Sequence, residues 1–233
     1  MISTKLQAIF AVRMKYSYRQ ILSLVKKDVL LETRQQYTFY GVLLYVASTV
    51  FIVYLSAGQP DEQTWNSLFW IVQLFVSVNA VAKSFLQDSR ARMLYYYTIS
   101  GPVNFIIAKM LFNALLMMLM SLLTLLIFMV LLGNPIIYFF KFLLISFIGG
   151  IGLSFLFTFL AAIAARAQQQ AALMAIMGFP IAVPQLLLLG KISGKAFSDV
   201  VQTGWWQMLL LLVCLDILIV ILSIILFPFL WKD

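Results

Sequence analysis

The amino-acid sequence is built from apolar blocks of about 20 residues or more, the length of helix that crosses a hydrocarbon layer about 30 Å thick. Of its 233 residues, 64% are hydrophobic and 10% are charged. A soluble domain carries about a quarter of its residues as charges, so this chain has too few to cover a water-facing surface. The sequence therefore predicts an all-α membrane protein with a single membrane domain, residues 38–231.

Six membrane-spanning helices are predicted in this domain. Polar turns separate them, among them Gly58 to Thr64 and Gly133-Asn134-Pro135, because Gly, Asn and Pro favour turns. A polar loop is expected at 190–204. The predicted spans are 38–57, 65–82, 102–132, 138–163, 171–189 and 206–230.

Residues 18–36 are predicted to form an amphipathic helix at the membrane interface, which together with a cytoplasmic tail makes up residues 1–37. Such a helix has one apolar and one charged side. Asp28 and Glu32 are exceptions, because they fall within the apolar sector one turn apart, and this side is therefore expected to meet protein in part. The apolar sector otherwise holds Ile21, Leu22, Val25 and Val29, and the polar sector holds Ser23, Lys26, Lys27 and Arg34.

The distribution of Lys and Arg predicts that both termini are cytoplasmic. Twelve of these residues lie in the N-terminal tail, in the 83–101 and 164–170 loops and at the C-terminus, and two, Lys191 and Lys195, lie on the opposite side. Cytoplasmic loops carry the excess of positive charge in membrane proteins. The net charge of +8 is explained in this way, and nucleic acid is not an expected partner.

The sequence contains few residues of the kinds that catalyse reactions or bind cofactors. It contains no histidine and one cysteine, Cys214, which excludes histidine-based acid–base chemistry, histidine metal ligands and an intrachain disulfide. It has no G-x-x-x-x-G-K-[ST] phosphate loop, and the lookalike at 190–196 has the wrong spacing. We expect neither a catalytic site, a metal site nor a directly bound cofactor, and ATP would be bound by another chain.

The cytoplasmic loop at 83–101 is the most informative segment. Its polar cluster of Gln87, Asp88, Arg90 and Arg92 precedes three tyrosines at 95–97. One interpretation is a positively charged loop with tyrosines at the membrane interface. The other is a docking surface for a cytoplasmic partner, with charged residues setting the register and tyrosines as anchors.

Two further features lie in or near the sixth predicted span. Asp216 lies about ten residues into it, where a carboxylate is costly unless it is paired, protonated or hydrated. It marks either a functional polar contact or a neutral bond to a neighbouring helix, and no basic residue at that depth is an obvious partner. Trp205 and Trp206 stand at the outer end of this span, as interfacial anchors or as a surface that contacts haem or a periplasmic partner.

Four segments together resemble the haem exporter protein B family of cytochrome c maturation, a permease family within the ABC-2 type transporters. They are KKDVLLETR (26–34), VNAVAKSFLQDSRARMLYYYTISGP (78–102), LLGNP (131–135) and FPIAVPQLLLL (179–189). The resemblance covers roughly 20–230 and is most specific at 78–102. It implies a permease subunit in the inner (cytoplasmic) membrane that pairs with a cytoplasmic ABC ATPase.

The resemblance also implies a further haem-handling membrane subunit and a periplasmic haem chaperone, with haem as the candidate substrate and a homodimer as one mode of assembly. ATP hydrolysis would then drive haem export or release of the haem-loaded chaperone. The interfacial helix and the 83–101 loop are the sizeable cytoplasmic surfaces, so they are expected to carry the coupling to the ATPase. The expected coupling residues are Asp28, Glu32, Arg34, Asp88, Arg90 and Arg92.

Three rival functions stay open at this stage. An ABC-2 permease for another substrate shares the fold, because one fold serves many functions. A scaffold that only organises the assembly complex differs in not depending on a partner ATPase for transport. A membrane-embedded enzyme is disfavoured by the missing histidine and by the absence of closely spaced carboxylates within the spans.

Overall fold

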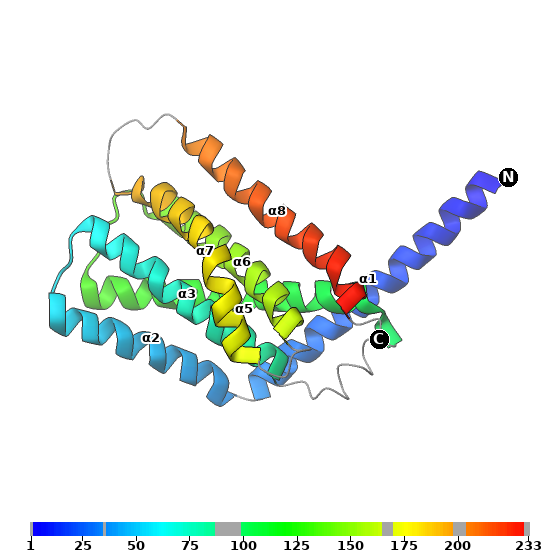
Figure 1. Ribbon diagram of the computed structural model, residues 1–233, viewed down its shortest axis with the longest axis horizontal. Helices are drawn as coiled ribbons and strands as arrows, with labels where there is room; N and C mark the ends of the chain where they lie inside the picture. Colours follow the sequence, from blue (N-terminus) through cyan, green and yellow to red (C-terminus); the bar gives the residue numbers. More distant parts are fainter. Residues whose placement is uncertain (1, 35, 87–98, 165–169, 198–203, 231–233) are drawn as a thin grey trace.

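The computed structural model describes residues 2–34, 36–86, 99–164, 170–197 and 204–230. Within these ranges the chain forms seven helices and no strand (Figure 1). The all-α class predicted from the sequence is therefore confirmed. The helices are α1 Ile2–Arg34, α2 Gln36–Ala57, α3 Glu62–Leu86, α5 Pro102–Leu132, α6 Phe139–Ala164, α7 Gln170–Gly194 and α8 Trp205–Leu230.

Five of these helices, α3, α5, α6, α7 and α8, contain segments long and apolar enough to cross a membrane. Within the part of α2 whose side chains the structure describes, the apolar stretch is Tyr40–Ser56. The count of six spans remains a prediction. The bounds of α5 coincide with the predicted span because both ends are marked in the sequence. Pro102 starts the helix, where its missing N–H costs nothing. Gly101 and Gly133 flank it with φ of 78° and 81°, values that favour glycine.

The structure corrects three predicted boundaries. The loop expected at 190–204 is too long, because α7 continues through Gly194 and includes Lys191. The turn expected at 58–64 is shorter, because α3 already begins at Glu62. Thr64 Oγ1 donates a hydrogen bond of 2.5 Å to Asp61 Oδ1, and this bond lowers the pKa of Asp61. The N-terminal helix is longer than 18–36, since α1 spans Ile2–Arg34.

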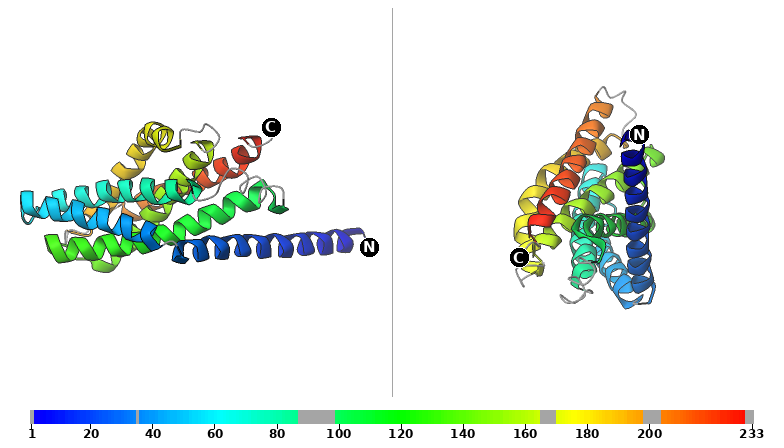
Figure 2. Two further views of the ribbon diagram at one scale, coloured as in Figure 1. Left: turned by 90° about the horizontal axis from the view of Figure 1, so that it is seen from below. Right: turned by 90° about the vertical axis from the view of Figure 1, so that its right-hand side faces the viewer.

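Helices α5 and α6 form the centre of the bundle. Helix α5 packs against α1, α2, α3, α6 and α8, while α6 also contacts α3, α7 and α8. Helix α1 crosses the end of the bundle obliquely, and its N-terminal part extends beyond the other helices (Figures 1 and 2). Residues of the C-terminal half of α1 are therefore the ones that reach the membrane domain.

An aromatic core fills the end of the bundle at the turn between α2 and α3. The Trp65 ring stacks on Phe69 with a centroid separation of 5.8 Å and meets Phe128, Phe142 and Phe197 edge-on. Trp65 Nε1 donates to the carbonyl of Gly133 at 3.3 Å. Aromatic rings favour such edge-to-face arrangements, and here they fix α3 against α5 and α6.

Glycines on α6 allow its neighbours to approach closely at Gly149, Gly150 and Gly152. A Cβ at Gly149 would overlap Trp70 of α3 and Leu189 of α7, and one at Gly150 would overlap Ser121 of α5. Small residues serve this purpose in membrane helices, where packing replaces the hydrophobic effect between helices. These glycines therefore serve the packing of α6 against its neighbours.

Candidate functional site

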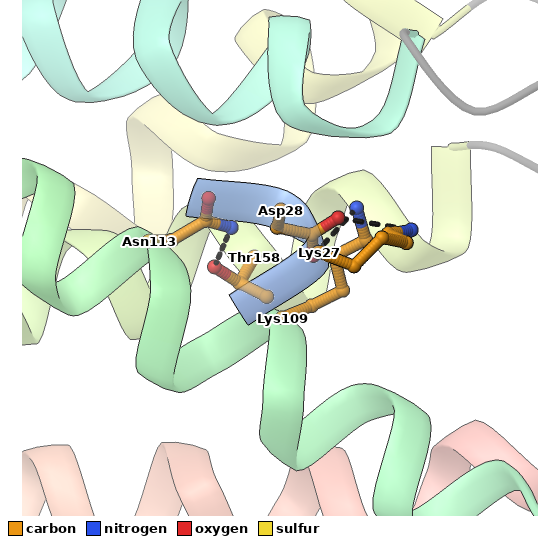
Figure 3. Close-up of polar contacts among 5 residues, drawn as sticks. All are labelled: Lys27, Asp28, Lys109, Asn113 and Thr158. Carbon is orange, nitrogen blue, oxygen red and sulfur yellow. Dashed lines mark hydrogen bonds and ion pairs between the residues drawn. The ribbon is translucent and has the colours of Figure 1, made fainter. Parts of the chain in front are cut away.

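A buried ion pair joins α1 to the membrane domain. Asp28 of α1 places Oδ2 3.2 Å from Lys109 Nζ of α5, and its Oδ1 lies 3.0 Å from Lys27 Nζ (Figure 3). Asp28 is 5% exposed and Lys109 is 2% exposed. Burying either charge alone would be costly, and the cost is offset only when the partner is present. The buried position of Asp28 is therefore explained by Lys109, and that of Lys109 by Asp28.

The polar contacts continue from α5 to α6. Asn113 lies one turn after Lys109, and its Nδ2 donates to Thr158 Oγ1 of α6 at 2.9 Å (Figure 3). Thr158 in turn donates to the carbonyl of Ser154 at 2.6 Å. All three side chains are buried. Two polar contacts, one turn apart on α5, thus join this helix to α1 and to α6. We call Asp28, Lys109, Asn113 and Thr158 the α1–α6 polar relay.

The structure separates the six expected coupling residues by position. Asp28 points into the bundle, where it holds α1 on α5. Glu32 is half-buried one turn later, and Arg34 is exposed at the C-terminal end of α1. Asp88, Arg90 and Arg92 lie outside the described residues. Asp28 is therefore placed to position α1, whereas the Arg34 side chain is exposed at the end of the helix.

A second buried polar contact surrounds Asp216 of α8. Gln185 Nε2 of α7 donates to Asp216 Oδ1 at 3.0 Å, and both side chains are buried. Gly152 of α6 leaves the room for this pair, because a Cβ there would overlap the Asp216 carboxylate and the Gln185 amide. The partner of Asp216 is thus a neutral amide, and the pair joins three helices.

The two tryptophans at the start of α8 have different surroundings. Trp205 is half-buried and packs against the main core, whereas Trp206 is 74% exposed. Their rings meet at 78° with centroids 4.8 Å apart. Because the rings are nearly perpendicular, a flat ligand such as a porphyrin has room to stack on one of them and not on both. Trp206 is the ring that offers a free face.

Sequence reasoning missed Lys109, Asn113, Thr158 and Gln185. A role for Lys109 could have been predicted from the sequence, because a lysine inside a 31-residue apolar helix needs a counterion or a route to water. Together with Asp28, the carboxylate on the wrong side of its helix, it suggests a pair. Asn113, Thr158 and Gln185 carry no charge, so their roles become visible only once the helices are packed.

A comparison with protein families decides the identity. The family model described as CcmB protein matches residues 19–230, which covers the C-terminal half of α1 and all the following helices. The chain belongs to the CcmB protein family. The resemblance seen in the sequence is confirmed, and a comparison with curated proteins gives no significant match.

Family membership fixes the broad role of the chain. A CcmB protein is the haem exporter protein B, a permease-type membrane component of the haem export machinery in cytochrome c maturation. Its apolar helices make it a multi-pass membrane protein. The α1–α6 polar relay lies within the matched region, as do Gln185 and Asp216.

Proposed function

We propose that this CcmB protein is the permease subunit of an ABC transporter complex in the inner membrane, coupling a separate cytoplasmic ATPase to haem export or to release of the haem-loaded periplasmic chaperone. The observation that carries the proposal is the buried Asp28–Lys109 pair. It fixes α1, a helix that exposes Arg19, Lys26 and Arg34, to the central membrane helix. A force applied to α1 from the cytoplasm would therefore reach α5.

The coupling surface of the proposal combines the end of α1 with the loop that follows α3. Arg34 and Glu32 are placed at the end of α1, and Asp88, Arg90 and Arg92 supply charges in the loop. Charged residues at an interface set its register and the rate of association. The α1–α6 polar relay would then carry the movement from this surface to α6.

The further partners follow from the same proposal. A haem-handling membrane subunit and a periplasmic haem chaperone would face the opposite side, where Trp206 offers an exposed aromatic ring. A six-span subunit is half of the usual membrane core of an ABC transporter, so a homodimer or a pairing with another membrane subunit completes it. ATP stays on the partner ATPase, and haem is the substrate.

The test is co-purification in detergent with the ATPase encoded beside this chain. We expect wild type to retain the ATPase and the double variant Asp88→Ala/Arg90→Ala to lose most of it, because two charges of the docking surface are gone. Arg34→Ala should weaken retention by roughly fivefold to tenfold, the effect of about 1–1.4 kcal/mol. Lys141→Ala is the matched control, since Lys141 is an exposed cation on α6, where it packs over the Tyr138 ring.

Haem content of the purified complex distinguishes a permease from a scaffold. For a permease, haem content should change when ATP is hydrolysed, and a catalytically inactive ATPase should abolish that change. If wild type binds no ATPase, the transporter proposal is wrong. If the ATPase binds but its activity leaves haem content unchanged, the scaffold function replaces it.

A further inference from the structure

A groove of about 320 Å³ lies between α6 and α8 and reaches the carboxyl group of Asp216. Its other lining residues are isoleucine, valine and phenylalanine side chains of these two helices. Ile217 and Ile221 of the lining are each 52% exposed, so the groove opens on the lipid-facing surface of the bundle. A groove of this size admits a small molecule, and the polar group that it presents is the Asp216 carboxyl.

Asp216 lies near the middle of its helix and of the membrane. It follows Trp205 by eleven residues and precedes Leu230 by fourteen, which correspond to roughly 17 Å and 21 Å along α8 at 1.5 Å per residue. The apolar segment of α8, Trp205–Pro228, is long enough to cross a membrane, whose hydrocarbon layer is about 30 Å thick. Water is therefore distant from this carboxyl group in both directions along α8, whereas the groove connects it to lipid.

The charged groups on the helices packed against α8 are engaged elsewhere or lie at helix ends. Lys109 of α5 is paired with Asp28, Lys141 lies in the first turn of α6, and Lys191 lies in the last turn of α7. Within the part of the chain that the structure describes, no cation pairs with Asp216. An ionised Asp216 would thus be a buried charge without a counterion, a cost that a carboxyl group avoids by keeping its proton.

The amide of Gln185 independently favours the neutral acid. Its Nε2 donates to Asp216 Oδ1 at 3.0 Å, while its Oε1 is buried and has no hydrogen-bond partner among the described residues. A protonated carboxyl group can donate to such an acceptor, and a carboxylate cannot. We propose that Asp216 carries its proton in the folded chain, and that the α6–α8 groove makes this neutral acid a binding and reaction site for small lipid-soluble molecules, carbodiimides among them.

The test is labelling of the full chain in phosphatidylcholine vesicles with dicyclohexylcarbodiimide, followed by peptide mass mapping. The protonated acid adds across one C=N bond of the reagent: the carboxyl oxygen bonds to the central carbon, and the proton moves to a nitrogen. The acyl group then shifts from oxygen to nitrogen and leaves a stable N-acylurea, with no leaving group.

We expect Asp216 to be labelled, and its labelling to fall as the pH rises, because the ionised form lacks the proton that the addition consumes. A carbodiimide with a quaternary ammonium group cannot enter hydrocarbon and should leave Asp216 unlabelled. Asp28 is an internal control within the same chain, because it is equally buried but paired with Lys109 and Lys27. Its ionised carboxylate should not be labelled.

A matched pair of tryptophan variants tests the groove as the route to the acid. Ile217→Trp fills the groove and should lose most of the labelling, and Asp216→Asn should lose all of it. Leu218→Trp is the control, because Leu218 is similarly exposed on the same helix and does not line the groove, so it should be labelled as wild type is. The proposal is overturned if wild type is not labelled at Asp216 at any pH, or if the charged carbodiimide labels it as fast as the lipid-soluble one. It is also overturned if the two tryptophan variants are labelled at the same rate, since the groove would then not be the route.

Discussion

Replacing Lys109 by alanine is expected to lower the free energy of unfolding by about 1–3 kcal/mol, because the buried Asp28 then keeps only the ion pair to Lys27 of its own helix and loses the contact that joins α1 to α5. The two groups are 3.2 Å apart and almost fully buried, so water cannot readily replace the lost cation. The neighbouring Lys27 lies 3.0 Å from Asp28 but is attached to the same helix, so it cannot hold α1 on α5. Unfolding of the purified chain in mixed micelles with increasing denaturing detergent measures the change.

Two variants separate the ion pair from the general loss of a lysine. Lys141→Ala removes an exposed lysine from α6 and should change stability by less than about 1 kcal/mol. The double variant Asp28→Asn/Lys109→Met removes both charges together and should recover most of the stability that Lys109→Ala loses. If Lys109→Ala is no less stable than Lys141→Ala, the pair does not hold α1 on the bundle, and the proposed route from the ATPase to α5 fails with it.

Most of the fold can be predicted from the sequence, because membrane helices are long apolar segments and polar turns separate one helix from the next. The bounds of α5 were predicted to the residue, since Gly101, Pro102 and Gly133 mark both ends chemically. The end of α7 was missed because Lys191 and Gly194 look like loop residues, yet Ser193 there packs inward. Its Oγ donates to Asn66 Oδ1 at 2.7 Å and accepts from Trp70 Nε1 at the same distance.

The contacts of the candidate site are harder to predict from the sequence, because they join helices that are distant along the chain. The carboxylate of Asp28 on an apolar helix side correctly indicated contact with protein, but the sequence alone does not choose Lys109 as its partner. Asp216 lacked an obvious basic partner because its partner, Gln185, is uncharged. Trp65 is a similar case. A tryptophan at the start of a span suggests an interfacial residue, whereas the packed helices bury it completely.

Gly152→Ala tests the second polar contact and should lower the free energy of unfolding by about 1–3 kcal/mol, the usual cost of overpacking. The added methyl group would overlap the Asp216 carboxylate and the Gln185 amide, so α8 must move away from α6 or the hydrogen bond of 3.0 Å must break. Gly190→Ala is the matched control. It adds the same methyl group to helix α7, where nothing lies within 4 Å of the new atom, and alanine favours a helix more than glycine does.

A double variant shows whether the clash with Asp216 is the cause. Asp216→Ala removes the carboxylate that the new methyl group meets, so Gly152→Ala should cost less in that background than in wild type. Residues in contact give such non-additive effects, whereas independent residues add within about 0.5 kcal/mol. Strict additivity would mean that the cost of Gly152→Ala does not come from the Asp216 carboxylate, which leaves the Gln185 amide as the group that the methyl meets. Non-additivity would instead establish that Gly152 and Asp216 are coupled and that their contact holds α8 close to α6.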